Sequence, residues 1–565
     1  MTNHAKSPVI ELHSLIHYEE RRIFNSFPLE RRRGLIEIAR SMDLFWTSLN
    51  LGIITASEQT REASQFITFG LNKSLHLFLD DSCGRPGFPL ARSNNETNQW
   101  ANSVLIHCGR LGLCEHLLEI CRVGLGELYK ERPRVYRFKY TSHPIGFESI
   151  EREDFTWMAE FIAHRQADKQ KRLNEQQCKI WKIMSGLVDT WHKYYIQYET
   201  HPEVDEFYQE VGLLHAQRMF GQDSFPGDTK FGGEDFNLYR ETVGVLIGWS
   251  LKHMSFCTQL MKKVPYINPR NIITVPQHFD DKAKYLASAL TIDTQAARQA
   301  LQTLTLTREN KQVHCVAPGN FVAPALIEAG QGRVIFPVWG CTSHPFIFML
   351  NELKRKHRSD WDRAVDMREV LFRRELYELF QSTKFFKIDR DINIKIGGSI
   401  VTDIDALILD RSKGVVAIFQ LKWQDMFGGS IRERESRKRN FQHTGNKWVE
   451  RVSQWLASNS IAETCKMLGF EQDDINRANE FRIFVISRYA AHFSGSGTLD
   501  PRAAWGTWYQ FLRIIVEQGN LENPLNSLFS SMVENSPIKR KRPIIPVEEL
   551  NIRDVHIIVE STNSE

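Results

Sequence analysis

Three side chains stand at positions where buried strands seldom carry charge or amide groups. Asp405 lies within the apolar run DIDALILD, and Gln420 and Lys422 end a second apolar run, VVAIFQLKW. Residues at i and i+2 of a strand project from one face, so Gln420 and Lys422 share a face. A tight turn at 412–414 would let the two runs pair and bring Asp405 to Gln420. We therefore expect one site that contains a carboxylate, an amide and a lysine.

Such a site suits the hydrolysis of a phosphodiester. A hard cation held by oxygen ligands neutralises the scissile phosphate and generates a hydroxide. Asp405 would be the principal ligand, the Gln420 side chain would offer its carbonyl oxygen, and the backbone carbonyl of Leu421 would complete the protein share. Lys422 would orient or activate the attacking water and stabilise charge in the transition state.

The elements that must position these residues can be predicted from periodicity. Residues 364–381 share an apolar face at helical spacing, which predicts a helix. The segment FFKIDRDINIKIGG alternates like a strand and stops at Gly397 and Gly398. The two apolar runs then form a hairpin of buried strands, and Phe481 to Ser487 adds another strand that ends before Arg488.

This order of elements and residues, over 361–489, resembles the PD-(D/E)xK nuclease superfamily, especially its Mrr-like branch, in which Gln commonly replaces the acidic residue before xK. The resemblance implies a mixed central sheet flanked by helices and DNA cleavage that depends on Mg²⁺, for which Mn²⁺ can substitute. Asp403 precedes Ile404 where the family often has Pro or another acid, so Asp403 stays an alternative ligand. We favour Asp405 because it lies deeper in the apolar run.

Many members of that superfamily also carry a glutamate on the first helix that points at the metal. Glu375 is the candidate in this sequence, with Glu369 and Glu378 as rivals, because helix phase alone does not choose among them. The alternative is that Glu375 is an exposed residue in a salt bridge.

A basic segment, Ile431 to Arg451, follows the second apolar run. Its excess of positive charge predicts contacts with DNA phosphates, and the alternative is a solvated helix face. Trp448, Val452 and Trp455 recur at helical spacing and are expected in the core. The cationic candidates are Arg432, Arg434, Arg437, Lys438, Arg439, Lys447 and Arg451.

The rest of the 565-residue chain divides by pattern into a mostly helical region (1–270), a winged-helix-like module (271–345), the α/β nuclease-like domain (350–495) and a C-terminal extension (496–565). In the module, two short helices would precede strands at 312–316 and 333–338. A DNA-reading helix would present Gln295, Arg298 and Gln299, and the alternative is a helical hairpin packed on its neighbours.

The composition narrows the class of protein. A net charge of +4 requires any DNA surface to come from local clustering, and nine scattered cysteines without CxxC favour a reducing compartment. The spacing of His107, Cys108, Cys114, His116 and Cys121 fits no standard zinc site, so buried structural cysteines are expected. No segment is apolar enough for a membrane span, which predicts a cytoplasmic protein. The KRKR cluster at 539–542 is typical of a linker, a phosphate contact or a nuclear signal.

These features together predict a metal-dependent endodeoxyribonuclease, with a helical N-terminal half that serves recognition, regulation or oligomerisation. A role in restriction or anti-phage defence follows by analogy alone. DNA, a second copy of the chain and a regulatory partner are the expected partners. One alternative is a nuclease fold with an idle site that binds DNA or acts as a scaffold, and another is a helical interaction protein.

Overall fold

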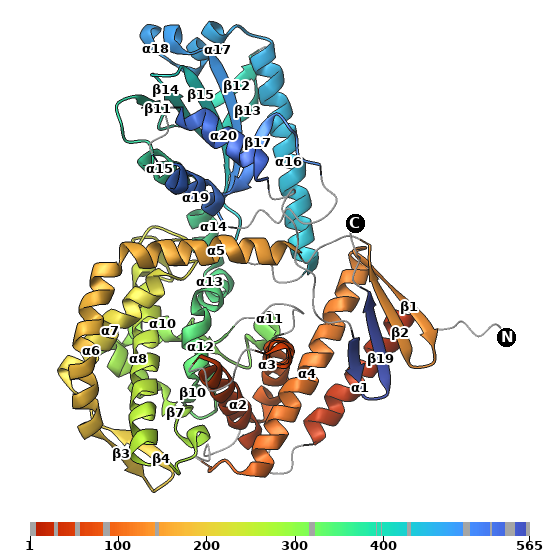
Figure 1. Cartoon of the computed structure of the whole chain (residues 1–565), viewed down its shortest axis with the longest axis vertical. Helices are drawn as coiled ribbons and strands as arrows, with labels where there is room; N and C mark the ends of the chain where they lie inside the picture. The colour runs from red at the N-terminus through yellow and green to blue at the C-terminus, as the bar shows by residue number, and fades with distance from the viewer. Residues whose placement is uncertain are drawn as a thin grey trace, which may run out of the picture.

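The computed structural model describes residues 7–26, 32–50, 57–82, 91–141, 146–315, 323–390, 392–396, 398–425, 431–489, 498–519, 523–536 and 549–560. It combines helices and strands in two lobes (Figure 1). Most of the helices of the N-terminal half form the lower lobe, and a sheet with flanking helices forms the upper lobe. The fold is thus a large helical region followed by an α/β region.

Long helices dominate the N-terminal region, as its periodicity predicts. Apolar residues recur at helical spacing across Ile180 to Tyr195, which predicts a helix there. This prediction is wrong beyond Leu187, because residues 188–198 form a hairpin in which His192 and Lys193 adopt positive φ. The elements are α1 (Pro8–Asn25), α2 (Arg32–Asn50), α3 (Glu58–Ser82), α4 (Asn95–Arg122), β1 (Gly126–Arg132), β2 (Val135–Tyr140), α5 (Gly146–Arg165), α6 (Ala167–Leu187), β3 (Val188–Trp191), β4 (Tyr195–Tyr198), α7 (Pro202–Gln217), β5 (Lys230–Phe231), β6 (Glu234–Asp235) and α8 (Phe236–Lys263).

The middle region packs helices around a small sheet of order β7-β10-β9-β8. Residues 311–315 are helical, so the strand predicted at 312–316 is wrong. Directly before this helix, the side chain of Asn310 accepts a hydrogen bond from the Thr307 amide at 2.7 Å. The elements are β7 (Val275–His278), α9 (Phe279–Leu290), α10 (Thr294–Gln302), β8 (Thr305–Leu306), α11 (Lys311–Cys315), β9 (Leu326–Glu328), β10 (Arg333–Phe336), α12 (Val338–Ser343) and α13 (Pro345–Lys356).

The upper lobe contains a mixed five-stranded sheet of order β11-β14-β15-β16-β17. β14 pairs antiparallel with β11 and β15, and β15, β16 and β17 are parallel. The elements are α14 (Arg358–Asp366), α15 (Arg368–Glu378), β11 (Phe385–Lys387), β12 (Ile392–Ile396), β13 (Ser399–Ile404), β14 (Ala406–Asp410), β15 (Val415–Lys422), α16 (Ile431–Ala457), α17 (Ile461–Leu468), α18 (Gln472–Arg477), β16 (Glu480–Ser487), β17 (Ala503–Thr507), α19 (Trp508–Gln518) and α20 (Pro524–Glu534).

Alternate residues of the central strands enter two different cores. On one face of the sheet, Leu407 and Ile418 pack with Trp448 and Val452 of α16. On the other face, Ile408 packs with α15 and α19. The sheet is therefore buried on both faces, as its continuous apolar runs predict. The predicted core positions Trp448, Val452 and Trp455 are confirmed.

The segment after residue 495 contributes to both lobes. β17 adds an outer strand to the central sheet, so this sheet continues past the expected boundary. β18 (Glu549–Ile552) pairs with β19 (Val555–Glu560), and β19 runs parallel to β2 of the N-terminal region. The end of the described chain thus belongs structurally to the lower lobe.

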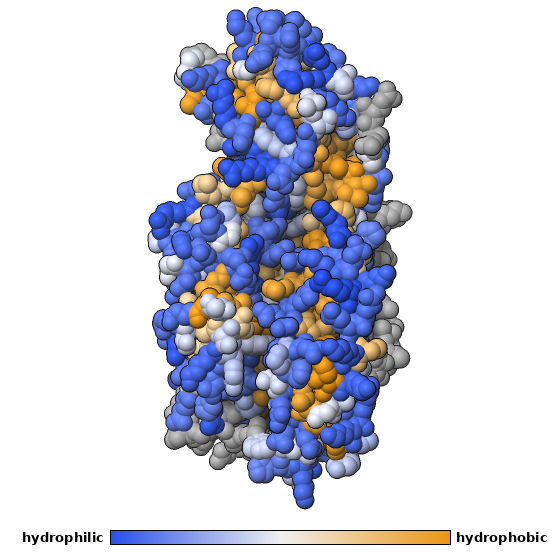
Figure 2. Space-filling model, turned by 90° about the vertical axis from the view of Figure 1, so that its left-hand side faces the viewer, coloured by the Kyte–Doolittle hydropathy of each residue, from blue (hydrophilic) through white to orange (hydrophobic). Residues whose placement is uncertain are grey.

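Figure 2 shows one side of the molecule as mainly hydrophilic, with separate hydrophobic patches, one of them at the level where the lobes meet. Among the described residues, none of the helices has the length and apolar character that a membrane crossing requires.

Candidate active site

The hairpin of β14 and β15 places Asp405 beside Gln420. Ala406 pairs with Phe419, and the Asp405 amide donates to the Phe419 carbonyl at 3.2 Å. The turn at the other end depends on Gly414, which has a φ of 74°. The predicted register is confirmed, and it aligns Asp405, Gln420 and Lys422 on the face that α16 covers.

The Asp405 carboxylate is held by the neighbouring strand. Its Oδ2 accepts a hydrogen bond from the Leu421 amide at 2.6 Å and another from the Gln420 side-chain amide. Arg373 of α15 donates to the Asp405 carbonyl at 2.9 Å and fixes the backbone. The residue is only 4% exposed, and burial raises the pKa of its carboxyl to about 7, although the nearby Lys422 opposes this rise.

Lys422 lies near this carboxylate and contacts a second one. Its Nζ lies 3.3 Å from Oε1 of Glu369, the residue after the start of α15. Burial alone would lower the pKa of Lys422, but Asp405 and Glu369, with a smaller contribution from Asp403, raise it. Lys422 is therefore a fixed positive charge among three carboxylates, and about a third of its side chain stays exposed.

Of the three helix glutamates, the structure brings Glu369 to this site. Glu375 instead pairs with Arg488, with Nη2 and Oε1 3.1 Å apart, and Glu378 is exposed. Arg488 also pairs with Asp223, which lies between α7 and α8. Helix phase could not choose among these glutamates, because the choice depends on Arg488 and on a loop from the other lobe.

The basic segment is the helix α16, and its cations divide between two sides. Arg432, Arg439, Lys447 and Arg451 are exposed, and the first three fall within roughly 80° around the helix axis. Lys438 is buried and pairs with Glu435 at 2.9 Å, and Arg437 pairs with Glu433 at 2.7 Å.

Arg434, on the same inner side of α16, is half-buried, and burial lowers its pKa to about 10. Only the exposed side of the helix therefore offers charge to a polyanion, and of the predicted phosphate contacts, Arg434, Arg437 and Lys438 do not lie on it.

Other predicted ligands and contacts fall elsewhere in the molecule. Cys108 and Cys114 are buried in the core of the lower lobe, and His107 contacts Glu19 at 3.1 Å. In α10, Gln295 is exposed, but Arg298 pairs with Asp280 and Gln299 donates to the Gly232 carbonyl at 3.0 Å. The last two face the chain itself, as in the packed-hairpin alternative. The KRKR cluster at 539–542 lies outside the described residues.

The donor set suits Mg²⁺ better than a transition metal. Within the described part of the chain, no three His, Cys, Asp or Glu side chains are grouped to enclose an ion. Mg²⁺ keeps several waters and needs only one or two carboxylates, so Asp405 with carbonyl oxygens of Gln420 and Leu421 would be a sufficient protein share. The Gln420 amide would have to turn to present its oxygen to a metal, since its nitrogen faces Asp405.

A second group of functional interest was missed by the sequence analysis. Arg368 and Asp425 flank the site in the chain, yet neither belongs to an apolar run or a recognisable motif. They contact each other at 2.7 Å where the two lobes meet.

No family model, no curated protein and no solved structure was found to match this chain.

Proposed function

We propose that the chain is a metal-dependent endodeoxyribonuclease of the PD-(D/E)xK type. The observation that carries this proposal is the buried Asp405 carboxylate, held by the Leu421 amide beside the ion pair of Lys422 and Glu369. Burial raises the pKa of the Asp405 carboxyl to about 7, so its ionised form is destabilised near neutral pH. A bound cation would stabilise that ionised form.

In this proposal Asp405 would hold the cation, with carbonyl oxygens of Gln420 and Leu421. A cation bound there would supply an activated water and neutralise the scissile phosphate. Lys422 orients the attacking water and stabilises the developing charge, and Glu369 fixes the Lys422 amine through its 3.3 Å contact. Glu369 replaces Glu375 as the helix glutamate of the site.

The substrate is DNA in this proposal, and the exposed side of α16 supplies phosphate contacts. Double-strand cleavage by a chain with a single site would use two copies, so a homodimer is part of the proposal. Restriction or anti-phage defence is the biological setting that the resemblance suggests.

A second candidate is a DNA-binding protein with an idle site. It is favoured by the Gln420 amide, which donates to Asp405 and occupies the oxygen that a metal would use. The two candidates are separated by incubating supercoiled plasmid with the purified chain and Mg²⁺ or Mn²⁺. A nuclease converts the plasmid to nicked or linear forms and stops with EDTA, whereas an idle site retards the plasmid without cutting it.

A further inference from the structure

A pocket of about 430 Å³ lies where α13 of the middle region and α14 meet the end of β15 and the start of α16. Asp405, Gln420 and Lys422 do not line it, whereas Trp423 and Asp425, which follow Lys422 in the chain, do. Its walls combine cations with apolar and aromatic side chains, among them Ile347, Leu350 and Trp361. This volume lies within the usual range for small-molecule sites, roughly 300 to 1,000 Å³.

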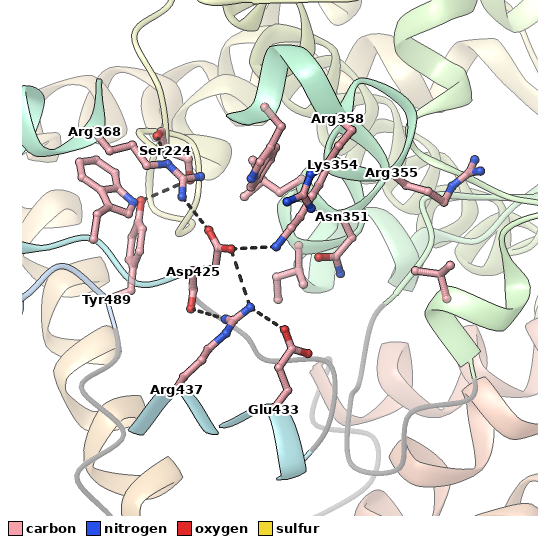
Figure 3. Close-up of a pocket in the computed structure, with 15 residues that line it drawn as sticks. Ser224, Asn351, Lys354, Arg355, Arg358, Arg368, Asp425, Glu433, Arg437 and Tyr489 are labelled. Carbon is pink, nitrogen blue, oxygen red and sulfur yellow. Dashed lines mark hydrogen bonds and ion pairs between the residues drawn. The ribbon is translucent and has the colours of Figure 1, made fainter. Parts of the chain in front are cut away.

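Three cations from three elements converge on one carboxylate in this pocket. Asp425 accepts from Arg368 at 2.7 Å and from Lys354 at 3.2 Å, and Arg437 lies 3.8 Å away. Figure 3 shows Asp425 at the centre, with these three side chains directed toward it. Burial would raise the pKa of Asp425, but Arg368 and Lys354 outweigh this and lower it.

The carboxylate does not balance these cations. Arg437 has a second partner in Glu433 at 2.7 Å, and Arg355 and Arg358 at the rim are paired with Glu352 and Asp362. The single negative charge of Asp425 is therefore opposed by the two positive charges of Lys354 and Arg368 and by part of the charge of Arg437. Arg368 is held in place by packing on Phe225 and Trp361, at 4.2 and 5.0 Å from the ring centres.

We propose that this pocket binds a small phosphate-bearing ligand, of nucleotide size, whose phosphate replaces Asp425 among Lys354, Arg368 and Arg437. A phosphate carries up to two negative charges and three acceptor oxygens, so it satisfies three converging donors better than one carboxylate does. The apolar wall at Ile347, Leu350 and Trp361 then receives the rest of the ligand.

The position of Asp425 gives the ligand a route to the candidate active site. Asp425 follows Lys422 by three residues, and Arg368 directly precedes Glu369, the partner of Lys422. A ligand that releases Asp425 and holds Arg368 therefore acts on both sides of the Lys422–Glu369 pair. Binding at the pocket is independent of the proposed nuclease function, and only this coupling rests on it.

The test measures binding of inorganic pyrophosphate and of ATP to the full chain by calorimetry, without divalent metal and with EDTA. EDTA keeps a metal at Asp405 from recruiting the phosphates, so the result does not depend on cleavage. We expect both probes to bind the wild type, and the double variant Lys354→Gln/Arg437→Gln to bind at least about tenfold more weakly. Arg363→Gln, an exposed α14 arginine that does not line the pocket, should bind like the wild type.

The replacement of Asp425 has its own variant. Asp425→Asn removes the competing charge and should bind pyrophosphate more tightly, by about tenfold. Thermal melting of each variant shows whether it is folded. If Asp425→Asn does not fold, the double variant Lys354→Gln/Arg437→Gln still tests the site. The absence of pyrophosphate and ATP binding to the wild type, or equal binding by the double variant, overturns the site. Weaker binding by folded Asp425→Asn overturns the replacement.

Discussion

At the scale of single residues, the proposed chemistry depends on the charge of Asp405. Its folded pKa of about 7 lies above the ordinary value near 4, because the carboxylate is buried. Without metal, the folded chain therefore binds more protons than the unfolded chain between about pH 4 and pH 7. Over this window the contribution of Asp405 to stability falls as the pH rises.

Metal binding should offset this loss of stability, because the cation stabilises the ionised Asp405 carboxylate. The affinity for the metal should therefore depend on pH. A cation needs the ionised carboxylate, so its affinity should rise about tenfold per pH unit below pH 7 and level off above. Calorimetric titration with Mn²⁺ from pH 5.5 to 8 measures this dependence. Asp405→Asn should bind Mn²⁺ weakly at every pH. An affinity that does not change with pH in the wild type would argue against Asp405 as the ligand.

Gln420→Glu tests the second ligand. A second carboxylate beside Asp405 should lower the melting temperature without metal through repulsion, and Mg²⁺ should restore it and raise it more than in the wild type. Half-maximal cleavage should then need less Mg²⁺, whereas Gln420→Ala should need more. Thermal melting and plasmid cleavage at graded Mg²⁺ give the two readouts. A Gln420→Glu variant that Mg²⁺ does not stabilise would remove Gln420 from the metal site.

At the scale of elements, α16 should bind phosphates through its exposed side. Replacing Arg432, Arg439 and Lys447 with Gln should weaken binding on unrelated DNA sequences alike and reduce the salt dependence by up to about three phosphate contacts. Fluorescence anisotropy with labelled duplexes at graded salt measures both. The control replaces Lys169, Lys171 and Lys182, three exposed lysines of α6. Equal slopes for the wild type and the α16 variant would make this side a solvated surface.

The elements of the central sheet could be predicted because their local signals agree with their environment. The runs around Asp405 and Gln420 are apolar on both faces, Gly414 permits the turn, and the structure has β14 and β15 there. Residues 311–315 and 188–191 were mispredicted, because their short apolar patterns fit a helix or a strand and tertiary contacts decide between them.

The candidate site could be predicted only where its residues lie on adjacent strands. Asp405 and Gln420 are cross-strand neighbours, so the turn between them fixes their approach. Glu369, Asp425 and the buried half of α16 depend on packing between segments distant in the sequence. The burial of Lys438 against Glu435 is an example, since the composition of α16 does not reveal which side faces the protein.

At the scale of the whole molecule, Arg488 joins the two lobes at the end of β16. It is 3% exposed and pairs with Asp223 from the helical region and Glu375 from α15. The Tyr489 hydroxyl donates to Asp223 at 2.6 Å. Because β15 ends at Lys422 beside β16, the helical region is anchored next to the candidate site.

Arg488→Ala should destabilise the chain strongly, because it leaves the Asp223 and Glu375 carboxylates facing each other without a cation. A broken buried pair costs about 3 to 5 kcal/mol, and we expect a loss at or below the lower end of this range because both carboxylates are more than a third exposed. Urea denaturation measures it, with Arg172→Ala as the control for an exposed pair, which should cost less than about 1 kcal/mol. A similar loss in both variants would mean that Arg488 does not hold the lobes together.

The proposed function requires that one site, built from Asp405 and Lys422, cuts DNA with a bound metal. Plasmid cleavage by Asp405→Ala and Lys422→Ala, each measured beside its Mn²⁺ affinity, tests this requirement, and variants of two exposed residues, Asp473→Ala and Lys466→Ala, are the controls. Both site variants should lose at least about a hundredfold in cleavage rate, and only Asp405→Ala should also lose Mn²⁺ binding. Cleavage that survives both site variants at the rate of the controls would contradict the assignment of this site.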